Sequence, residues 1–525
     1  MTSVVQCGSL SGIDAVGVRV EVSTVRGLPG FDIVGLPEAA VRESRVRVQA
    51  ALRNSGFTLP EQRFVVNLAP GDVRKSGSGF DLPIALALLA QCGLCSPSRF
   101  DSTLVFGELS LDGQLRPARG LLAQLGSARR RGLTEALIPL TGSPFARLMS
   151  ELDVRCAEHL VEAVAFMNGQ HSLPGPLVTR ALPADDDAPC MSDVRGQQAA
   201  KRALEIAAAG GHDIVMIGPP GTGKSMLAQR LPGILPEPTV EEQLELATIA
   251  SAAGMPPERA LTPLGSARPF RAPHHTCSDV ALIGGGDPIR PGEVTLAHRG
   301  VLFLDELPEF RRAALEALRP TMERGEAVVV RTRDRAVMPA RPLIVAAMNP
   351  CPCGYHGSKR RVCRCSADVV KRYLGRVSGP LLDRFDLHVL LPAVPVRALR
   401  SLPNGEPSEV VRERVVVARQ RQTTRRAGRT KPLQLDDLTA ELEPEALRFL
   451  HRTLAQLELS LRAYGKVLKV SRTIADLDGS DFVRTPHVAE AVQYRVLDRD
   501  QQDQQQSTTA PSGEAVTTLK ETSCP

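Results

Sequence analysis

The chain has 525 residues, too many for one hydrophobic core, and we expect about two to four domains. Hydrophobic residues make up 43% and charged residues 23% of the composition, which excludes a fibrous or mostly disordered protein. The net charge of +6 is a small excess for this length, so charge by itself does not establish a nucleic-acid partner.

The N-terminus has neither the basic start nor the apolar centre of a secretory signal. The longest apolar run, 84–94, is about half as long as a membrane-spanning helix. We therefore expect a cytoplasmic protein without a membrane partner. In that compartment the eleven cysteines are expected to be reduced thiols or metal ligands rather than disulfides.

Residues 1–168 alternate short β-like runs with helical patterns, which predicts an α/β or α+β domain. The strands are predicted at 16–22, 63–68, 104–106 and 136–139, and the helices at 82–91 and 121–131. The following segment, 169–191, is rich in Pro, Gly and acidic residues and predicts an exposed linker.

Residues 192–395 carry the pattern of an α/β core with a parallel sheet. A helix is predicted at 197–209, strands at 213–217, 301–304 and 343–347, and a second helix from Lys224. A polar connector, 396–431, leads to a helical region, 432–499. The final segment, 500–525, is rich in Gln, Ser and Thr and predicts disorder.

A phosphate-binding loop is the strongest local signal. The sequence GPPGTGKS matches G-x-x-x-x-G-K-[ST] and lies between an apolar strand and a helix, as that motif requires. Its backbone N–H groups would wrap phosphates, Lys224 would reach the β- and γ-phosphates, and the Ser225 hydroxyl would ligate Mg²⁺. The expected nucleotide-binding residues are Gly218, Pro219, Pro220, Gly221, Thr222, Gly223, Lys224 and Ser225. A glycine-rich turn without a ligand would not require Lys and Ser at these positions, so we expect ATP and Mg²⁺.

Two later strands end in polar residues of the kind that ATP hydrolysis uses. VLFLDE ends in Asp305, expected to hold Mg²⁺, and Glu306, expected to polarise the attacking water. PLIVAAMN ends in Asn349, whose amide would orient the water or contact the γ-phosphate. Solvated acids at a strand end, and an ordinary turn before proline, are the simpler alternatives for these residues.

Several motifs together resemble the YifB/ComM family of Mg-chelatase-like AAA+ ATPases. They are GPPGTGKS, FRAPHHT (270–276), PGEVTLAHRGVLFLDELPEF (291–310), AAMNPCPCG (346–354), GPLLDRFD (379–386) and LSLRAY (459–464). The resemblance implies an AAA+ P-loop α/β core with helix-2 and pre-sensor-1 inserts and a C-terminal helical lid. It also implies that Asn349 is the sensor-1 residue, Arg384 an arginine finger reaching a neighbour's ATP, and Arg462 the sensor-2 residue. A trans-acting arginine requires a homo-oligomer, which the resemblance implies to be a hexameric ring.

The two inserts implied by the resemblance correspond to 272–295 and 327–341. The second contains RTRDRAVMPAR, with four arginines that would track a phosphate backbone by charge. A solvated basic hairpin is the alternative. The adjacent His274 and His275 give little support for a metal site and are interpreted as loop residues.

Residues 107–139 resemble the proteolytic domain of Lon proteases, which implies a Lon-protease-like (S5-like) α+β domain over 1–168. A serine peptidase of this kind pairs Ser with Lys. At the Lys position this chain has Leu122, and the Ser position falls near Gly79 in SGSGFD. Ser76 and Ser78 are interpreted as loop hydroxyls, and the domain as catalytically inactive and used for binding or assembly.

Four cysteines form a C-x-C-x₉-C-x-C pattern: Cys351, Cys353, Cys363 and Cys365. Four thiolates satisfy tetrahedral Zn²⁺, and we favour structural zinc slightly over four reduced thiols although C-x-C pairs are unusual.

The leading functional hypothesis is an ATP-driven ring motor on DNA. Resemblance to the ComM branch implies helicase and branch-migration activity on recombination intermediates. The alternatives are a chelatase-type motor subunit and an ATP-dependent remodeller of a protein partner. Leu122, at the position of the catalytic Lys, argues against a protease. Asp305, Glu306 and Arg384 argue against a non-enzymatic switch that only binds ATP.

Overall fold

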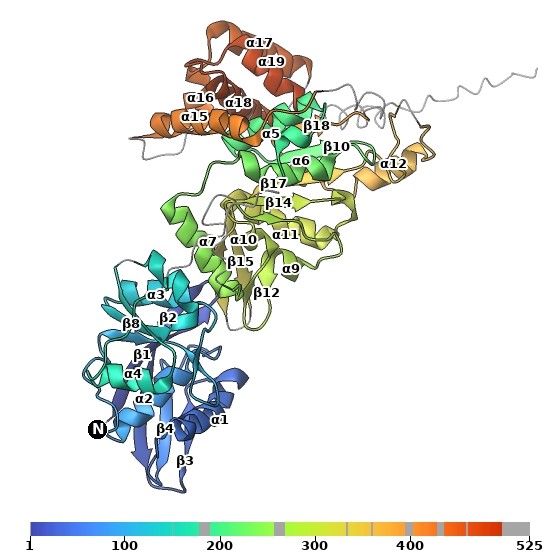
Figure 1. Ribbon diagram of the computed structural model, residues 1–525. Helices are drawn as coiled ribbons and strands as arrows, with labels where there is room; N and C mark the ends of the chain where they lie inside the picture. Colours follow the sequence, from blue (N-terminus) through green and yellow to red (C-terminus); the bar gives the residue numbers. More distant parts are fainter. Residues whose placement is uncertain are drawn as a thin grey trace, which may run out of the picture.

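The computed structural model describes most of the chain, and Figure 1 shows an N-terminal domain, a central core and a C-terminal helical bundle following one another in space. The described residues are 2–149, 151–177, 189–256, 268–331, 334–358, 361–393, 403–427, 435–457 and 460–495. The predicted disordered tail, 500–525, and Arg333 of the basic hairpin lie outside these ranges.

The N-terminal domain is built on a seven-stranded mixed sheet in the order β3-β4-β2-β1-β5-β8-β9. The strands are β1 (Ser3–Ser11), β2 (Asp14–Val25), β3 (Gly30–Val34), β4 (Arg63–Ala69), β5 (Thr103–Val105), β8 (Glu135–Pro139) and β9 (Asp153–Ala157), and a short hairpin joins β6 (Glu108–Leu109) to β7 (Leu115–Arg116). The helices are α1 (Ala39–Asn54), α2 (Asp81–Gln91), α3 (Leu121–Arg130) and α4 (Leu160–Met167). The four strands and two helices predicted here are all present, and β1, β3, β6, β7, β9, α1 and α4 are additional.

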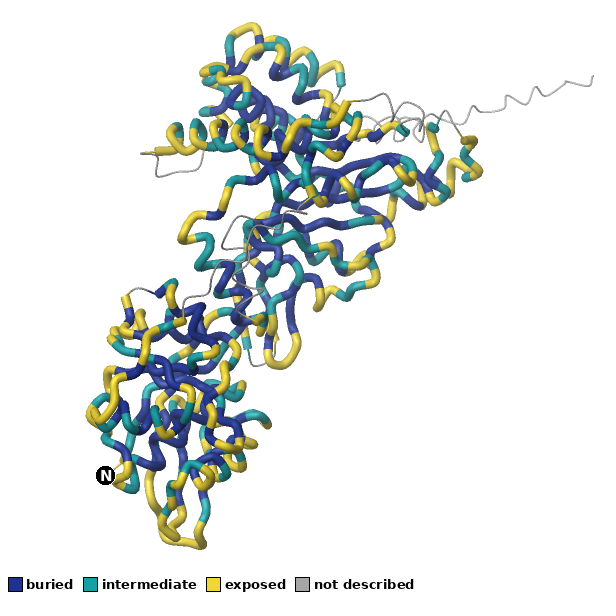
Figure 2. Tube along the Cα trace, viewed as in Figure 1, coloured by how far each residue is buried: buried dark blue, intermediate teal, exposed yellow. Residues whose placement is uncertain are grey.

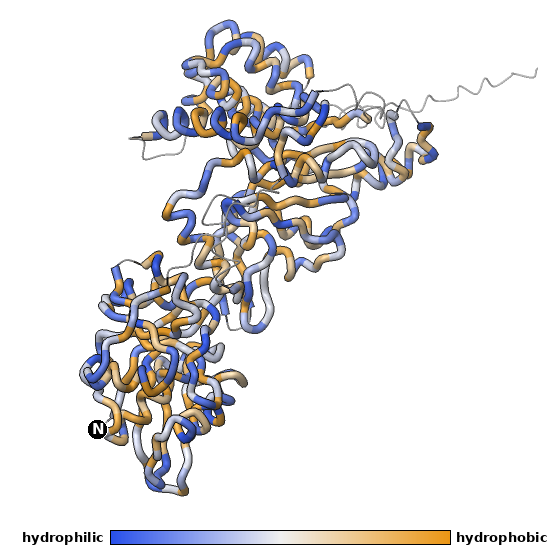
Figure 3. The backbone as a smooth tube through the Cα atoms, viewed as in Figure 1, coloured by the Kyte–Doolittle hydropathy of each residue, from blue (hydrophilic) through white to orange (hydrophobic). Residues whose placement is uncertain are grey.

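Helix α2 is the centre of this domain's core because it is buried from Asp81 to Leu89. Each buried leucine on it contributes about 2 kcal/mol of hydrophobic stabilisation. The buried Asp81 carboxylate at its start accepts hydrogen bonds from Arg47 Nε, at 2.7 Å, and from the Leu109 N–H, at 3.2 Å. In both sheets, the segments that are buried in Figure 2 are also the hydrophobic segments of Figure 3.

The central core contains a five-stranded, all-parallel sheet in the order β11-β14-β17-β10-β18. The strands are β10 (Ile214–Ile217), β11 (Phe270–Arg271), β14 (Val301–Leu304), β17 (Leu343–Met348) and β18 (Leu387–Leu390). The helices are α5 (Gln198–Gly210), α6 (Lys224–Arg230), α7 (Val240–Ala253), α11 (Arg312–Arg324), α12 (Ala367–Leu374) and α13 (Gly379–Leu382). The three core strands expected from the sequence are present, and the parallel α/β interpretation is confirmed.

Two antiparallel hairpins lie in the segments predicted as inserts. One joins β12 (Gly284–Gly285) to β13 (Arg290–Pro291) between α9 (Asp279–Ile283) and α10 (Glu293–Leu296), and the other joins β15 (Glu326–Val330) to β16 (Arg335–Pro339). Both hairpins meet the N-terminal domain. Arg74 donates to Asp287 at 2.8 Å, and Ile13 packs into the buried cluster that contains Ala336 and Met338.

Helix α7 extends this contact, because Ala247 and Ala250 belong to the same buried cluster as the N-terminal sheet. The Gly120 N–H donates to the Ser251 carbonyl at 2.9 Å, at the start of α3. The N-terminal domain is therefore fixed to the core by shared apolar packing, and the ion pair of Arg74 lies at the edge of that contact. The beginning of the predicted exposed linker differs from expectation, since Leu173 is buried and the Pro174 carbonyl accepts from the Cys156 N–H at 2.9 Å.

The C-terminal helices are α15 (Ser408–Arg426), α16 (Leu435–Ala440), α17 (Pro444–Gln456), α18 (Leu461–Leu477) and α19 (Thr485–Gln493). Helix α15 lies inside the segment predicted as a polar connector. Its buried Val411, Val415 and Ala418 follow one face and pack with α5 and α18. Among the residues the structure describes, no helix has the length and hydropathy to cross a membrane.

A buried ionic cluster joins α18 to the sheet. Asp386, just before β18, lies 3.2 Å from His212 Nδ1 and 3.1 Å from Lys466 Nζ. Burial opposes the charge of Asp386, but His212 and Lys466 together hold its pKa well below the usual range. The Thr473 hydroxyl lies 2.8 Å from His212 Nε2 and completes the connection.

We expect Asp386→Asn to destabilise the core by about 3 kcal/mol, because it leaves the Lys466 charge unpaired in a buried site. This corresponds to a fall in Tm of about 5–10 °C. The depressed folded pKa makes the carboxylate's contribution fully present at pH 7 and lost as the pH falls below the unfolded value of about 4. Differential scanning calorimetry at pH 7 checks this, with the exposed Asp436→Asn as control. Equal Tm values for the two variants would contradict it.

Candidate functional site: a phosphate loop at the carboxyl edge of the parallel sheet

The functional site lies where three neighbouring parallel strands end. In the register of the sheet, Leu304 of β14 pairs with Ala346 of β17, and Ile217 of β10 pairs with Met348 of β17. The residues that follow these strands therefore emerge at one edge. They are the loop from Gly218, the Asp305–Glu306 pair and Asn349, and ligands bind at this edge in open α/β sheets.

The loop 218–225 has the backbone that phosphate binding requires. Gly221 and Gly223 adopt φ values of +76° and +89°, in the left-handed region that favours glycine. A β-carbon at Gly218 would lie 2.6 Å from the Leu391 carbonyl oxygen, so a side chain is excluded there by the end of β18. The Thr222 hydroxyl donates to the Pro219 carbonyl at 2.9 Å and closes the loop on itself.

The Lys224 ammonium lies inside this loop. It donates to the carbonyls of Gly218 and Pro219 at 2.7 and 3.1 Å and to Asn349 Oδ1 at 3.2 Å. Burial lowers the pKa of Lys224, and the charges of Asp305 and Glu306 oppose that shift. The cation is thus held between the phosphate loop and the residue after β17, where an anionic phosphate is favoured.

The donor set fits Mg²⁺. Ser225 Oγ donates to Asp305 Oδ2 at 2.9 Å, so a hydroxyl and a carboxylate oxygen from different elements meet beside the loop. Magnesium prefers oxygen ligands and takes few of them from the protein, with water and phosphates supplying the rest. Ser225 and Asp305 would hold the ion.

Glu306 has an unusual backbone conformation, because its φ of +53° lies in the left-handed region although the residue is not a glycine. Non-glycine residues in this region are uncommon and concentrate at functional sites. Its N–H donates to Asp305 Oδ1 at 3.0 Å, and its Oε2 lies 3.2 Å from His275 Nδ1. The carboxylate is half-exposed, so it is open to water while His275 lies against one of its oxygens.

His275 was interpreted from the sequence as a loop residue, and its contact with Glu306 was not predicted. It belongs to the FRAPHHT segment, follows β11, and its ring lies 4.2 Å from that of His274. His274 in turn lies 2.9 Å from the Thr276 hydroxyl, which limits the motion of the pair. The sequence signal was the motif itself, but only the tertiary structure brings His275 to Glu306.

Arg384 and Arg462 lie at the opposite edge of the sheet. Arg384 precedes β18, whose first residue, Leu387, pairs with Ile214 at the beginning of β10. Its guanidinium bonds Glu323, and burial and then the nearby charge of Arg462 lower its pKa. Arg462 is exposed and lies 3.9 Å from Asp383. The structure therefore brings these two arginines together, and neither contacts the phosphate loop of its own chain.

The four cysteines converge as a metal site would require. Their sulfur atoms all lie within 4.8 Å of one another, and those of Cys351 and Cys363 are 3.7 Å apart. Thiolates about 2.3 Å from a zinc ion lie about 3.8 Å from each other in a tetrahedron. The N–H groups of Arg364 and Tyr355 lower the pKa of Cys353 to about 6. The Cys365 N–H lowers the pKa of Cys363, but burial and the neighbouring thiols outweigh it and raise that pKa, so Cys353 is the first of the two thiols to ionise.

This cysteine loop also touches the phosphate loop, because a β-carbon at Gly354 would lie 2.5 Å from Pro220 Cδ. Cys351 follows Asn349 by two residues. The loop 350–366 is thus joined to the candidate site by the chain and by packing.

Among the residues that the structure describes, Ser76 and Ser78 have no lysine partner. Ser78 Oγ bonds the Glu108 carboxylate, a contact that the sequence did not indicate, and Ser76 Oγ donates to the Leu10 carbonyl at 3.3 Å. Leu122 is buried in α3, and a β-carbon at Gly79 would lie 2.2 Å from the Phe106 ring. A serine at position 79 would therefore need that ring to move.

Comparison with known proteins agrees with this architecture. The family described as magnesium chelatase, subunit ChlI, matches residues 190–399, and the families described as subunit ChlI of Mg-chelatase and ChlI C-terminal match 20–142 and 405–495. The chain is 43% identical over 504 residues to the uncharacterized protein YifB of Escherichia coli, covering 95% of this chain and 97% of that protein. It is 42% identical over 501 residues to the competence protein ComM of Haemophilus influenzae, covering 93% and 96%.

A Lon protease of Salinispora arenicola is 31% identical over 134 residues, which is 24% of this chain and 17% of that protein. The similarity to the Lon protease is therefore confined to one segment of each protein and does not extend over the whole protease. The full-length matches decide the family. The chain belongs to the magnesium-chelatase-like family of YifB and ComM.

Proposed function

We propose that the protein is a cytoplasmic AAA+ ATPase that assembles into a homo-hexameric ring and moves DNA strands in recombination intermediates. The observation that carries the ATPase is the meeting of Lys224, Ser225, Asp305, Glu306 and Asn349 at one edge of a parallel sheet. Each of these side chains has a separate task in phosphoryl transfer.

In the proposed reaction, the loop N–H groups and Lys224 bind the β- and γ-phosphates, and Asn349 contacts the γ-phosphate or the attacking water. Ser225 and Asp305 hold Mg²⁺, which neutralises phosphate charge when bound. Glu306 accepts the proton of the attacking water. His275, 3.2 Å from Glu306, orients that carboxylate toward the site.

We further propose that Arg384 and Arg462 act on the ATP of a neighbouring subunit. Their position at the opposite edge of the sheet from the phosphate loop supports this, since a β-strand separates them from the nucleotide of their own chain. An arginine supplied by a neighbour makes hydrolysis depend on assembly. The N-terminal domain would serve binding or assembly, without peptidase activity.

DNA is the proposed partner because of the basic hairpin and the similarity to ComM, which is named a competence protein. Arg335 is exposed at the beginning of β16, and Arg331 lies at the tip of the hairpin. Such a hairpin in a ring would contact phosphates without reading sequence. Zinc is the proposed ion of the cysteine cluster, with a structural task.

The first test measures ATP hydrolysis with and without single-stranded DNA and a four-way junction at moderate salt. We expect DNA to stimulate the wild type and Glu306→Gln to lower the rate about 100-fold or more, because the amide cannot take a proton. ATP binding should persist in the variant. A wild-type rate indifferent to both DNA forms would reject the DNA motor and leave the ATPase to serve a protein partner.

Arg384→Ala should lower the ATPase rate about 1,000-fold while leaving ATP binding unchanged, because the arginine stabilises charge only in the transition state. Mixing it with Glu306→Gln subunits makes the test sharper. An Arg384→Ala subunit keeps its own Glu306 and receives Arg384 from a Glu306→Gln neighbour, so the mixture should regain activity that neither variant has alone. A mixture as inactive as its components would place the arginine's action within one chain. The exposed Arg372→Ala is the control.

Metal analysis of the purified protein should find one zinc ion per chain, and Cys353→Ser should lose it. Removal of zinc with a chelator should also lower ATPase activity, because the loop that contacts Pro220 and follows Asn349 loses its support. Cys92→Ser, in the N-terminal domain, is the control. Full ATPase activity of a zinc-free protein would show that the cluster does not support the nucleotide site.

A further inference from the structure

A cavity of about 410 Å³ opens at the amino edge of the parallel sheet. That size is within the range of small-ligand sites. Its walls come from the beginnings of β10, β14 and β17, from the C-terminal end of α11 and from α15. It is distinct from the nucleotide site, because Arg299 lies just before β14 while Asp305 follows the other end of that strand.

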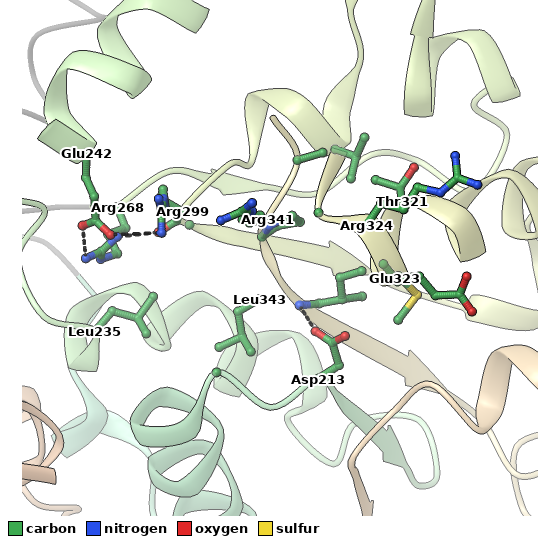
Figure 4. Close-up of a pocket in the computed structure, with 18 of the residues that line it drawn as sticks. Asp213, Leu235, Glu242, Arg268, Arg299, Thr321, Glu323, Arg324, Arg341 and Leu343 are labelled. Atoms are coloured by element: carbon green, nitrogen blue, oxygen red, sulfur yellow. Dashed lines mark hydrogen bonds and ion pairs between the residues drawn. The ribbon is translucent and has the colours of Figure 1, made fainter. Parts of the chain in front are cut away.

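Arginine dominates this cavity (Figure 4). The close-up shows Arg268, Arg299 and Arg341 in a row, with Arg324 beyond them. Arg419 from α15 is the fifth arginine of the lining, and the acidic residues are Asp213, Glu242 and Glu323. A cavity with this lining has a positive potential and favours an anion.

The carboxylates of the cavity are already engaged. Glu242 accepts from Arg268 at 2.7 Å and lies 3.5 Å from Arg299. Glu323 bonds Arg384, outside the cavity lining. Asp213 Oδ1 accepts the Ile344 N–H at 2.8 Å.

Three arginines are left without a carboxylate. Within the described ranges, the guanidinium groups of Arg324 and Arg341 make no hydrogen bond or ion pair, and that of Arg419 donates to the Ala208 carbonyl at 2.6 Å. Burial and then the charge of Arg268 lower the pKa of Arg419 to about 10, and the charge of Glu242 opposes that shift. Guanidinium groups bind phosphate oxygens through paired N–H donors.

We propose that this arginine cavity is a second phosphate-binding site, separate from the loop 218–225, and that it takes a phosphodiester group of a bound nucleic-acid strand. The source follows from position, since Arg341 comes two residues after β16 of the basic hairpin. The cavity is thus joined along the chain to the β15–β16 hairpin, whose exposed Arg335 lies at the beginning of β16. This source rests on the proposed DNA function, while the phosphate site itself does not.

The test compares Arg341→Gln with the wild type by fluorescence anisotropy of a labelled single-stranded oligonucleotide at several salt concentrations. We expect about 3- to 10-fold weaker binding and a slope of log K against log salt that is smaller by about 1. Arg324→Gln, on the exposed end of α11, repeats the test at a second position. Arg426→Gln, exposed on α15 outside the cavity, removes the same charge and is the matched control.

Thermal shift with inorganic pyrophosphate distinguishes the sources when a saturating, non-hydrolysable ATP analogue with Mg²⁺ already fills the loop 218–225. Pyrophosphate is added at a fixed concentration, and the Tm of each nucleotide-bound variant without pyrophosphate is the reference. Stabilisation of the wild type and of Arg426→Gln, lost in Arg341→Gln, together with weaker DNA binding, supports the proposal. The same stabilisation in a protein that binds no DNA supports the phosphate site with a free polyphosphate as ligand and rejects DNA as its source. Identical behaviour of Arg341→Gln and Arg426→Gln in both assays overturns the site, even where DNA stimulates the ATPase.

Discussion

The parallel sheet of the core keeps the phosphate loop and the arginines of the opposite edge one strand length apart. Strands β10, β14 and β18 have four residues each, about 13 Å. The phosphate loop, Asp305 and Asn349 leave the carboxyl edge, while Arg384 and the arginine cavity lie at the amino edge. Because no side chain spans that distance, the separation supports the proposal that Arg384 acts on the nucleotide of a neighbouring chain.

The amino edge is also where the helical bundle is fastened. Asp386 lies immediately before β18, bonds His212 and Lys466, and thereby fixes α18 to the sheet. Arg462, at the beginning of the same helix, is 3.9 Å from Asp383. A rotation of the bundle relative to the sheet would therefore move Arg462 relative to Arg384, which stays with β18 and with Glu323 of α11.

The sequence signals for the proposed nucleotide site are local, and the structure brings the residues that carry them to one edge of the sheet. The phosphate loop is a contiguous motif, and Asp305 and Asn349 each follow an apolar run that reads as a strand. The contact of His275 with Glu306 joins segments 31 positions apart and depends on α9, α10 and the β12–β13 hairpin lying between them. Neither that contact nor the left-handed backbone of Glu306 can be predicted from composition or periodicity.

Helix α15 was not predicted because its buried face is narrow. Val411, Val415 and Ala418 follow a helical spacing, but Arg, Glu and Gln dominate the remaining positions and make the segment polar on average. Burial of that stripe depends on α5 and α18, which lie about 200 positions before it and about 50 after it. Similarly, the linker expected at 169–191 begins with a buried leucine, Leu173, because β9 and the domain core offer it a site.

The N-terminal domain and the two hairpins form a mechanical unit with the core. Ile13 packs into the cluster of Ala336 and Met338, Arg74 bonds Asp287, and α3 bonds α7 through Ser251. The segment carrying His275 continues into the β12–β13 hairpin, and the β15–β16 hairpin continues through Arg341 into β17, which ends at Asn349. A displacement of either hairpin would thus be transmitted along the backbone to His275 or to Asn349 of the candidate site. The same connections reach the N-terminal domain, so its packing against the hairpins restricts how far they move.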